Sequence, residues 1–186
     1  SFLLTISAES ATNQLSNSLL LLDAPETHLH PQAQEYLKDE LIKITRNDKN
    51  NIVFFATHSN YMIDKDHIER CFRLSKQSNR KTKLEKIELG KTSYSEVNYE
   101  VFGIPSSDYH NELYGYLEDV EKSKLDGLPK TKKWKNKKTT TTEDVSLATY
   151  IRHSIHHPEN TQNTKFTAED LQESIKTLRE LKYGKK

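Results

Sequence analysis

Two short segments of the sequence place polar side chains, which could bind a metal ion or a phosphate, directly after an apolar run. In the first segment four consecutive leucines, at positions 19–22, are followed by Asp23 and then by Pro25 and Glu26. A short apolar run of this kind predicts a strand that is buried on both faces, as in a parallel sheet. Asp23 then lies at the carboxyl end of the strand, where open α/β sheets bind their ligands. The simpler interpretation, a core strand that ends in a loop aspartate, is the alternative.

The second segment is the apolar run at 52–56, which is followed by Thr57 and His58. A helix from Pro31 to about Thr45 is predicted between the two strands, because proline suits the first turn of a helix. The buried stripe of this helix comprises Tyr36, Leu37, Leu41 and Ile44. A single histidine after a strand is most often a polar loop residue, so the case for His58 depends on the segment before it.

The first segment resembles the Walker B region of ABC-type ATPases, in the form found in the RecF, SMC and OLD-like branch. In that family four apolar residues precede Asp-Glu-Pro-Glu, and His-Leu-His-Pro follows after a short link. The chain matches this pattern at Asp23, Pro25, Glu26, His28, Leu29, His30 and Pro31. The resemblance implies an α/β fold, the C-terminal lobe of an ABC-type ATPase, in which helices flank a parallel sheet.

The resemblance also assigns roles to the strand ends, with ATP and Mg²⁺ as the implied cofactors. Asp23 would hold the Mg²⁺ of MgATP through water, because Mg²⁺ is a hard ion that keeps much of its hydration shell. Glu26 and His58 would belong to the same nucleotide site. His58 would be the switch histidine, which touches the γ-phosphate and senses the partner subunit. A neutral imidazole can donate to a phosphate oxygen without adding a fixed charge, which suits a reversible sensor.

One position departs from the family pattern. Ala24 stands where the family has its catalytic glutamate. That glutamate orients and polarises the attacking water, and a methyl group can do neither. We therefore predict an ATPase that binds ATP but hardly hydrolyses it, a site disabled so that ATP is trapped. A naturally degenerate ATPase is the alternative.

The other phosphate-binding parts of the family are not found in this sequence. No Gly-x-x-x-x-Gly-Lys-Ser/Thr loop occurs. Residues 90–92 resemble its end, but Glu85 stands where the first glycine belongs, so we interpret them as a turn. The signature motif is also absent, although residues 2–12 are expected to form the helix that follows it in the family. Because the chain starts at Ser1 and its only methionine is Met62, we expect a longer polypeptide with these parts upstream.

Composition narrows the class of protein without identifying a ligand. Apolar residues make up 33% and charged residues 30% of the 186 residues, which suits one domain plus an appendage. The formal net charge of +1 does not by itself indicate nucleic-acid binding. Cys71 is the only cysteine, which excludes a disulfide scaffold and fits a reducing cytoplasm. No apolar run reaches membrane-spanning length and no signal peptide is seen, so we expect no membrane partner.

We expect three parts along the chain. Residues 1–117 would form the ATPase lobe. Residues 118–144 are rich in lysine and poor in aliphatic side chains, which predicts a solvated linker or mobile loop. Its lysines and Trp134 are also compatible with a nucleic-acid patch, because lysines neutralise phosphates and an indole stacks on bases. Residues 145–186 would form a mainly helical C-terminal extension, and a capping-box pattern at Thr167 predicts the start of its last helix.

The tail contains a second group of side chains that could do chemistry. Apolar residues at four-residue spacing predict a helix, namely Leu147, Ile151 and Ile155, and Pro158 ends it. At its end lie Arg152, His156 and His157, an arrangement that resembles the active motif of HEPN-type ribonucleases. The resemblance implies that a histidine activates a ribose 2′-hydroxyl while the arginine clamps the phosphate. A structural helix end, whose cations suit the helix dipole, is the alternative. A metal site of these histidines with His153 is disfavoured.

The layout as a whole, an SMC-like lobe followed by a tyrosine-rich segment and the basic tail, resembles the PtuA-type ATPases of bacterial anti-phage systems. These systems are Septu and the retrons that carry a PtuA–PtuB pair. The resemblance implies a homodimer or higher homo-oligomer in which ATP is sandwiched between two subunits. It also implies an HNH nuclease partner of the PtuB type, which ATP occupancy would hold or release. The alternatives are a DNA-repair or OLD-like ATPase, and an RNA-cleaving nuclease in the tail, with nucleic acid as a further partner.

Overall fold

The computed structural model describes residues 15–46, 50–87 and 92–184. The chain divides into two compact units, Ser1–Tyr94 and Ser95–Lys186. The division therefore lies inside the segment 1–117, for which we expected one continuous lobe. Among the described helices, none is long and apolar enough to cross a membrane.

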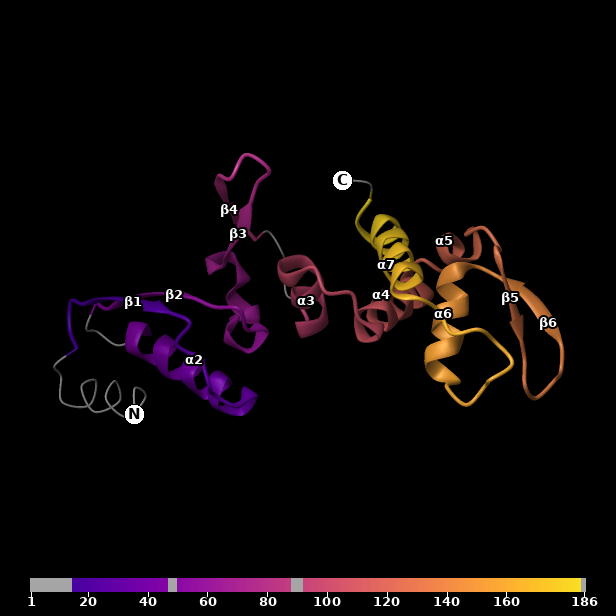
Figure 1. Cartoon of the computed structure of the whole chain (residues 1–186), viewed down its shortest axis with the longest axis horizontal. Helices are drawn as coiled ribbons and strands as arrows, with labels where there is room; N and C mark the ends of the chain where they lie inside the picture. The colour runs from indigo at the N-terminus through magenta and orange to yellow at the C-terminus, as the bar shows by residue number, and fades with distance from the viewer. Residues whose placement is uncertain (1–14, 47–49, 88–91, 185–186) are drawn as a thin grey trace. The chain divides into compact units, whose positions relative to one another are not determined.

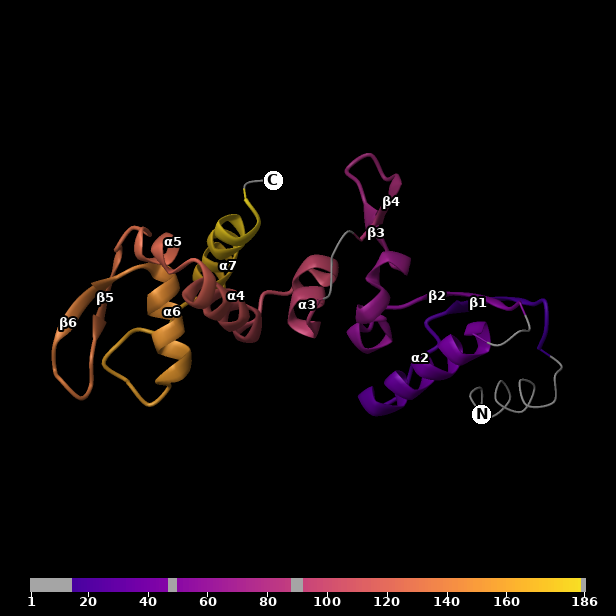
Figure 2. The same cartoon turned by 180° about the vertical axis from the view of Figure 1, so that it is seen from behind.

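The first unit is built on a parallel pair of strands. β1 (Leu19–Asp23) pairs with β2 (Ile52–Ala56) in register along their whole length, so that Asp23 lies opposite Ala56. The helix α2 (Pro31–Arg46) connects the two strands and lies along them in both views (Figures 1 and 2). The strand–helix–strand order confirms the α/β character that the sequence predicted.

α2 covers one face of this sheet. The core of the unit consists of side chains from α2 and from the 3-10 helix after β2, namely Leu37, Leu41, Ile44 and Met62, and they pack against Leu20, Leu22, Val53 and Phe55. The side chains of the opposite face are 55–71% exposed, namely Leu19, Leu21, Ile52 and Phe54. The prediction of strands buried on both faces is thus correct for one face only, because no other described element of this unit covers the second.

The rest of the first unit, after β2, consists of two short helices and a hairpin. After β2 come two 3-10 helices, η1 (Asn60–Met62) and η2 (Lys65–Arg70), and then an antiparallel hairpin of β3 (Phe72–Lys76) and β4 (Thr82–Lys86). Met62 is fully buried and joins this segment to the core under α2. The hairpin carries an ion pair between Arg73 and Glu85 at 3.2 Å, which lie opposite each other on neighbouring strands.

The second unit is mainly helical. α3 (Tyr94–Phe102) begins at the division and is followed by α4 (Ser107–Val120), α5 (Lys122–Asp126), β5 (Lys132–Lys135), β6 (Thr142–Val145), α6 (Leu147–His156) and α7 (Ala168–Tyr183). Its core joins α4, α6 and α7 through buried side chains that include Tyr109, Leu113, Leu117, Ile151, Ile175 and Leu178. A capping box of Thr167 and Asp170 opens α7, as its sequence predicted.

The lysine-rich segment 118–144 differs from the expected linker. It contains the end of α4, all of α5 and an antiparallel hairpin of β5 and β6. This hairpin lies beside α6 (Figure 1). The two pack together through Trp134, Val145 and Tyr150. Trp134 is only 4% exposed, so its indole is largely buried in the packing on α6 and is not the open stacking surface of the nucleic-acid alternative.

Arg179 of α7 ties that helix to α3 and α4. Its guanidinium lies over the rings of Tyr99 and Tyr109, at 5.2 and 5.7 Å from their centroids. It also forms ion pairs with Glu96 and Glu100 of α3. Cation–π contacts and ion pairs that share one half-buried arginine fix the orientation of the helix that carries it.

His110 of α4 is a buried titratable group in the core of this unit. Its side chain is fully buried, and its Nε2 lies 3.0 Å from the Oγ atom of Ser174. Its Nδ1 has no hydrogen-bond partner among the described residues. Burial, and secondarily the nearby charge of Arg152, lowers the pKa of His110 from 6.5 to about 4.

We expect the second unit to lose stability in mild acid because of His110. The folded state prefers the neutral imidazole, so the unfolded state takes up a proton first as the pH falls through 6.5, and the loss continues to about pH 4. The loss should be of the order of 1 kcal/mol per pH unit within this window. The measurement is denaturant unfolding at a series of pH values, with His110→Gln as the matched variant that cannot titrate. Equal pH slopes for the two proteins would contradict the prediction.

Candidate functional site

The carboxyl ends of β1 and β2 form one edge in the first unit. Because the strands are parallel and in register, Asp23 lies beside Ala56, and Thr57 and His58 follow directly. The ladder continues one residue further, since the backbone N–H of Ala24 donates to the carbonyl of Ala56 at 3.0 Å. The structure therefore brings together the strand ends that carry the predicted nucleotide-binding residues.

The chain turns sharply at position 24. Ala24 has a φ of +44°, in the left-handed region that L-residues rarely adopt. The carbonyl of Ala24 accepts from both the N–H and the Oγ1 of Thr27, at 3.1 and 2.6 Å, which holds the turn. Because the steric cost of this conformation arises at Cβ, a glutamate at position 24 would meet the same backbone cost as the alanine does.

Glu26 bonds the two strand ends to each other. Its side chain is 7% exposed, and its Oε1 accepts from the Oγ1 of Thr57 at 2.5 Å and from the backbone N–H of His58 at 3.1 Å. Its other oxygen, Oε2, is buried and has no hydrogen-bond partner among the described residues. Glu26 is thus a positioning residue for His58, and it keeps one carboxylate oxygen that a further donor or hydrated cation could use.

His58 is held by its backbone while its side chain remains exposed. The N–H of the next residue, Ser59, donates to Thr57, and the Oγ of Ser59 donates to the side chain of Gln34 at 2.5 Å. Gln34 in turn donates to the carbonyl of Leu29 at 2.8 Å. These bonds connect the loop after β1, the start of α2 and the loop after β2, so the imidazole of His58 projects from a fixed backbone.

The residues of this edge fit a hydrated Mg²⁺ and a phosphate. Asp23 is exposed, and within the described ranges no side chain pairs with its carboxylate. Mg²⁺ is commonly bound by one or two carboxylates, waters and substrate phosphates. No three His, Cys, Asp or Glu side chains form a metal-binding cluster in the part of the chain that the structure describes. Asp23 would hold such an ion, and the buried free oxygen of Glu26 marks a second unsatisfied acceptor at the same edge.

The tail residues are distributed differently from the predicted nuclease set. Arg152 is half-buried, and its guanidinium lies 5.5 Å from the ring centroid of Tyr114. His156 is exposed at the last position of α6, and neither it nor Arg152 lines the pocket beside the helix. His157, the residue after the helix, does line it. Arg152 and His156 lie one turn apart on α6, and only His157 of the three lines the pocket, so the ribonuclease role of this set stays a prediction.

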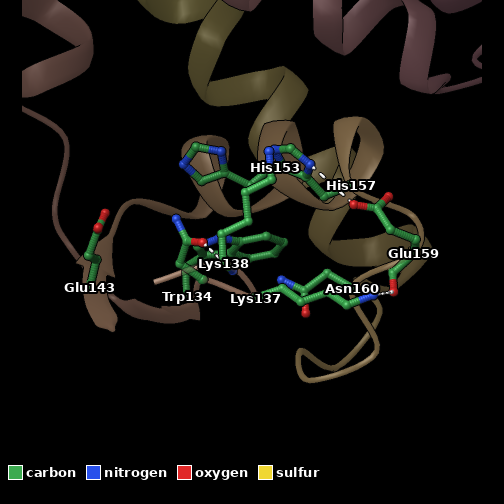
Figure 3. A pocket seen from close by; sticks show the side chains of 9 residues that line it. Trp134, Lys137, Lys138, Glu143, His153, His157, Glu159 and Asn160 are labelled. Atoms are coloured by element: carbon green, nitrogen blue, oxygen red, sulfur yellow. Dashed lines mark hydrogen bonds and ion pairs between the residues drawn. The ribbon is translucent and has the colours of Figure 1, made fainter. Parts of the chain in front are cut away.

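His153 lines this pocket together with His157. It lies one turn before His157, and the two rings lie 6.5 Å apart on the wall of the same pocket (Figure 3). Burial, and secondarily the charge of His157, lowers the pKa of His153. The four-residue spacing of the two histidines was visible in the sequence and could have identified the pair.

The chain is similar in sequence to an ATPase domain family and to a phage nuclease. Residues 1–63 match the family model described as an AAA ATPase domain. The chain is also 32% identical over 112 residues to the Old nuclease of Escherichia phage P2, an alignment that covers 58% of this chain and 19% of that protein. The chain thus spans about a fifth of the length of this relative. Both matches support an ATPase of the ABC and OLD-like kind.

We expect the carboxylate of Glu26 to be needed for the stability of this edge. Glu26→Ala would leave the Oγ1 of Thr57 and the N–H of His58 without an acceptor, at a cost of about 1–3 kcal/mol. Glu26→Gln keeps an acceptor at Oε1 and should cost less. Urea unfolding followed by circular dichroism measures the free energy of unfolding of each variant. If Glu26→Ala costs no more stability than Glu26→Gln, the hydrogen bonds of Glu26 do not hold the two strand ends together.

Proposed function

We propose that this chain supplies the Walker B part of a Mg²⁺–ATP site in a subunit of a bacterial anti-phage defence complex. In this proposal ATP is sandwiched between two copies of the subunit in a homodimer or a higher oligomer. Its occupancy controls an associated nuclease, of the HNH type carried by PtuB. The coarser part of this statement, an ABC and OLD-like ATPase, rests on the two matches above.

The observation that carries the proposal is the in-register parallel pairing that sets Asp23 and His58 at the same edge. Asp23 offers a carboxylate to a hydrated Mg²⁺, an ion that neutralises phosphate charge when bound. His58 offers an exposed imidazole whose backbone Glu26 holds in place. A carboxylate that can hold Mg²⁺ and an imidazole that can donate a hydrogen bond to a phosphate oxygen, on adjacent strand ends, suit nucleotide binding at such an edge.

Control of a nuclease is the finer part of the proposal. The relative from phage P2 is itself described as a nuclease, which supports pairing an ATPase of this kind with cleavage of nucleic acid. The tail resemblance to PtuA-type proteins favours a separate nuclease subunit. A DNA-repair or OLD-like ATPase is the runner-up.

We expect that Ala24→Glu restores ATP hydrolysis in the full-length protein. The carboxylate would orient and deprotonate the attacking water, and such a general base contributes about 10²–10⁴-fold in rate. Ala24→Gln is the matched control, because it has nearly the same size and backbone cost but no basic group. Phosphate release would be measured with both variants, and Asp23→Asn added to Ala24→Glu should abolish the gain. Equal rates for the Glu and Gln variants would contradict the role of position 24.

We expect that His58→Ala weakens ATP-dependent self-association while the fold stays intact. The exposed ring contributes little to the core, but a lost hydrogen bond to a charged phosphate should weaken assembly by about tenfold or more. Sedimentation velocity with and without ATP tests this, and nuclease activity is assayed on the same samples. His67→Ala, which removes another imidazole of the first unit, is the control. If His58→Ala alters neither assembly nor nuclease control, His58 is only a loop residue.

A further inference from the structure

A pocket of about 680 Å³ lies between the β5–β6 hairpin and the end of α6 (Figure 3). Its lining combines two lysines, two histidines, two asparagines, two glutamates and one tryptophan, namely Trp134, Asn136, Lys137, Lys138, Glu143, His153, His157, Glu159 and Asn160. This set belongs wholly to the second unit, so it is independent of the strand edge that carries Asp23. We propose that this pocket binds the phosphate group of a nucleotide or of a single-stranded nucleic acid.

The walls of the pocket are held rigidly by hydrogen bonds to backbone. The side-chain NH₂ of Asn160 donates to the carbonyl of Lys135 at 2.9 Å, and Asn160 is 8% exposed. Asn163 makes two more bonds with the backbone of Lys135, as a donor and as an acceptor. The loop after α6 is therefore fixed to β5, and a ligand would meet a pre-formed site that costs little ordering on binding.

The floor of the pocket is aromatic and orients the two imidazoles. The ring of Trp134 lies 5.2 Å from that of His153 and 6.4 Å from that of His157, measured between centroids. The Nδ1 of His157 lies 3.5 Å from a carboxylate oxygen of Glu159. When Nδ1 is engaged in this way, the Nε2 of His157 is the nitrogen left for a ligand.

The donors of the pocket suit a phosphate more than a neutral ligand. Lys138 is exposed, and its ammonium group has no ion-pair partner within the described ranges. Its neighbour Lys137 reaches only the backbone carbonyl of Glu159, at 3.4 Å. Lysine, amide and imidazole N–H groups are common partners of phosphate oxygens, and charge-assisted bonds of this kind are stronger than neutral ones.

Neither of the two pocket carboxylates forms an ion pair with Lys138 within the described ranges. Glu159 faces the Nδ1 side of His157, with one carboxylate oxygen 3.5 Å from Nδ1. Glu143 and Glu159 lie on opposite sides of the pocket, which leaves space for an anion between them (Figure 3). A volume of about 680 Å³ lies within the range of small-molecule sites and accommodates a nucleotide.

The experiment uses the fluorescence of Trp134, which is the only tryptophan of the chain and lies on the pocket floor. The full chain is titrated with inorganic phosphate, with AMP, with adenosine and with a single-stranded RNA oligonucleotide. We expect phosphate and AMP to change the emission and adenosine to have no effect. An oligonucleotide that binds more tightly than AMP identifies a nucleic-acid strand as the source of the phosphate, and tighter AMP binding identifies a free nucleotide.

Matched variants locate the binding. Lys138→Ala and His157→Ala should each weaken AMP binding by about tenfold, the scale of one charge-assisted hydrogen bond. Lys133→Ala is the control for the lysine, because Lys133 lies on the same hairpin, pairs with Asp144 and does not line the pocket. His156→Ala is the control for the histidine, because it neighbours His157 but also lies outside the lining. Both controls should bind like the parent chain.

Two results would overturn the proposal. One is the absence of any response to phosphate, AMP and RNA, and the other is equal binding of adenosine and AMP. Calorimetry repeats each titration without relying on fluorescence. Asp23→Asn should leave the response to AMP unchanged, so that failure of the pocket and failure of the proposed ATP site remain distinguishable.

Discussion

The parallel, in-register pairing of β1 with β2 is the constraint on which the edge that carries Asp23 and His58 depends. Each strand ends in a polar turn, and only this register brings the two turns together. A shift of one residue would turn the buried side chains of each strand outward and would break the bonds of Glu26. α2 selects the register, because its buried stripe fits one set of alternating side chains from both strands.

Glu26 shows how an apolar sheet tolerates a carboxylate at its edge. A buried charge is stable only when donors replace its lost hydration. Two donors from the loop after β2 do so for one oxygen, and the other oxygen lacks a partner among the described residues. In the second unit, hydrogen bonds from the side chains of Asn160 and Asn163 to the backbone of Lys135 similarly hold the loop after α6 against β5. In both units side chains fix a backbone and leave an imidazole exposed, at His58 and at His157.

Sequence patterns were sufficient where local periodicity determines structure. Apolar runs and a helical stripe placed β1, α2 and β2, and turn residues placed Asp23 and His58 at the strand ends. Tyr36, which we had included in that stripe, is 70% exposed, whereas Leu37, Leu41 and Ile44 are buried. Patterns were insufficient where tertiary contacts decide. The lysine-rich segment forms a hairpin because Trp134 finds a buried site on α6, which composition does not reveal. The guanidinium of Arg152 lies over the ring of Tyr114, a partner from another helix that the local sequence does not indicate. The hydrogen bonds by which Glu26 joins the two strand ends depend on strand pairing, and nothing in the local sequence indicates them.

The turn at Ala24 bears on how an alanine can replace a catalytic glutamate without disturbing the site. The backbone there is fixed by the bond to Ala56 and by the two bonds from Thr27, none of which involves the side chain at position 24. Under the proposed function, ATP binding would therefore survive the loss of the carboxylate, and only the activation of water would be lost. A ligand shifts an equilibrium only through contacts that differ between two states. A site that binds but does not turn over would remain in its occupied state for as long as ATP stays bound. Control of the nuclease would then depend on ATP dissociation rather than on hydrolysis, and the contact of His58 with the nucleotide would be the means by which occupancy is sensed.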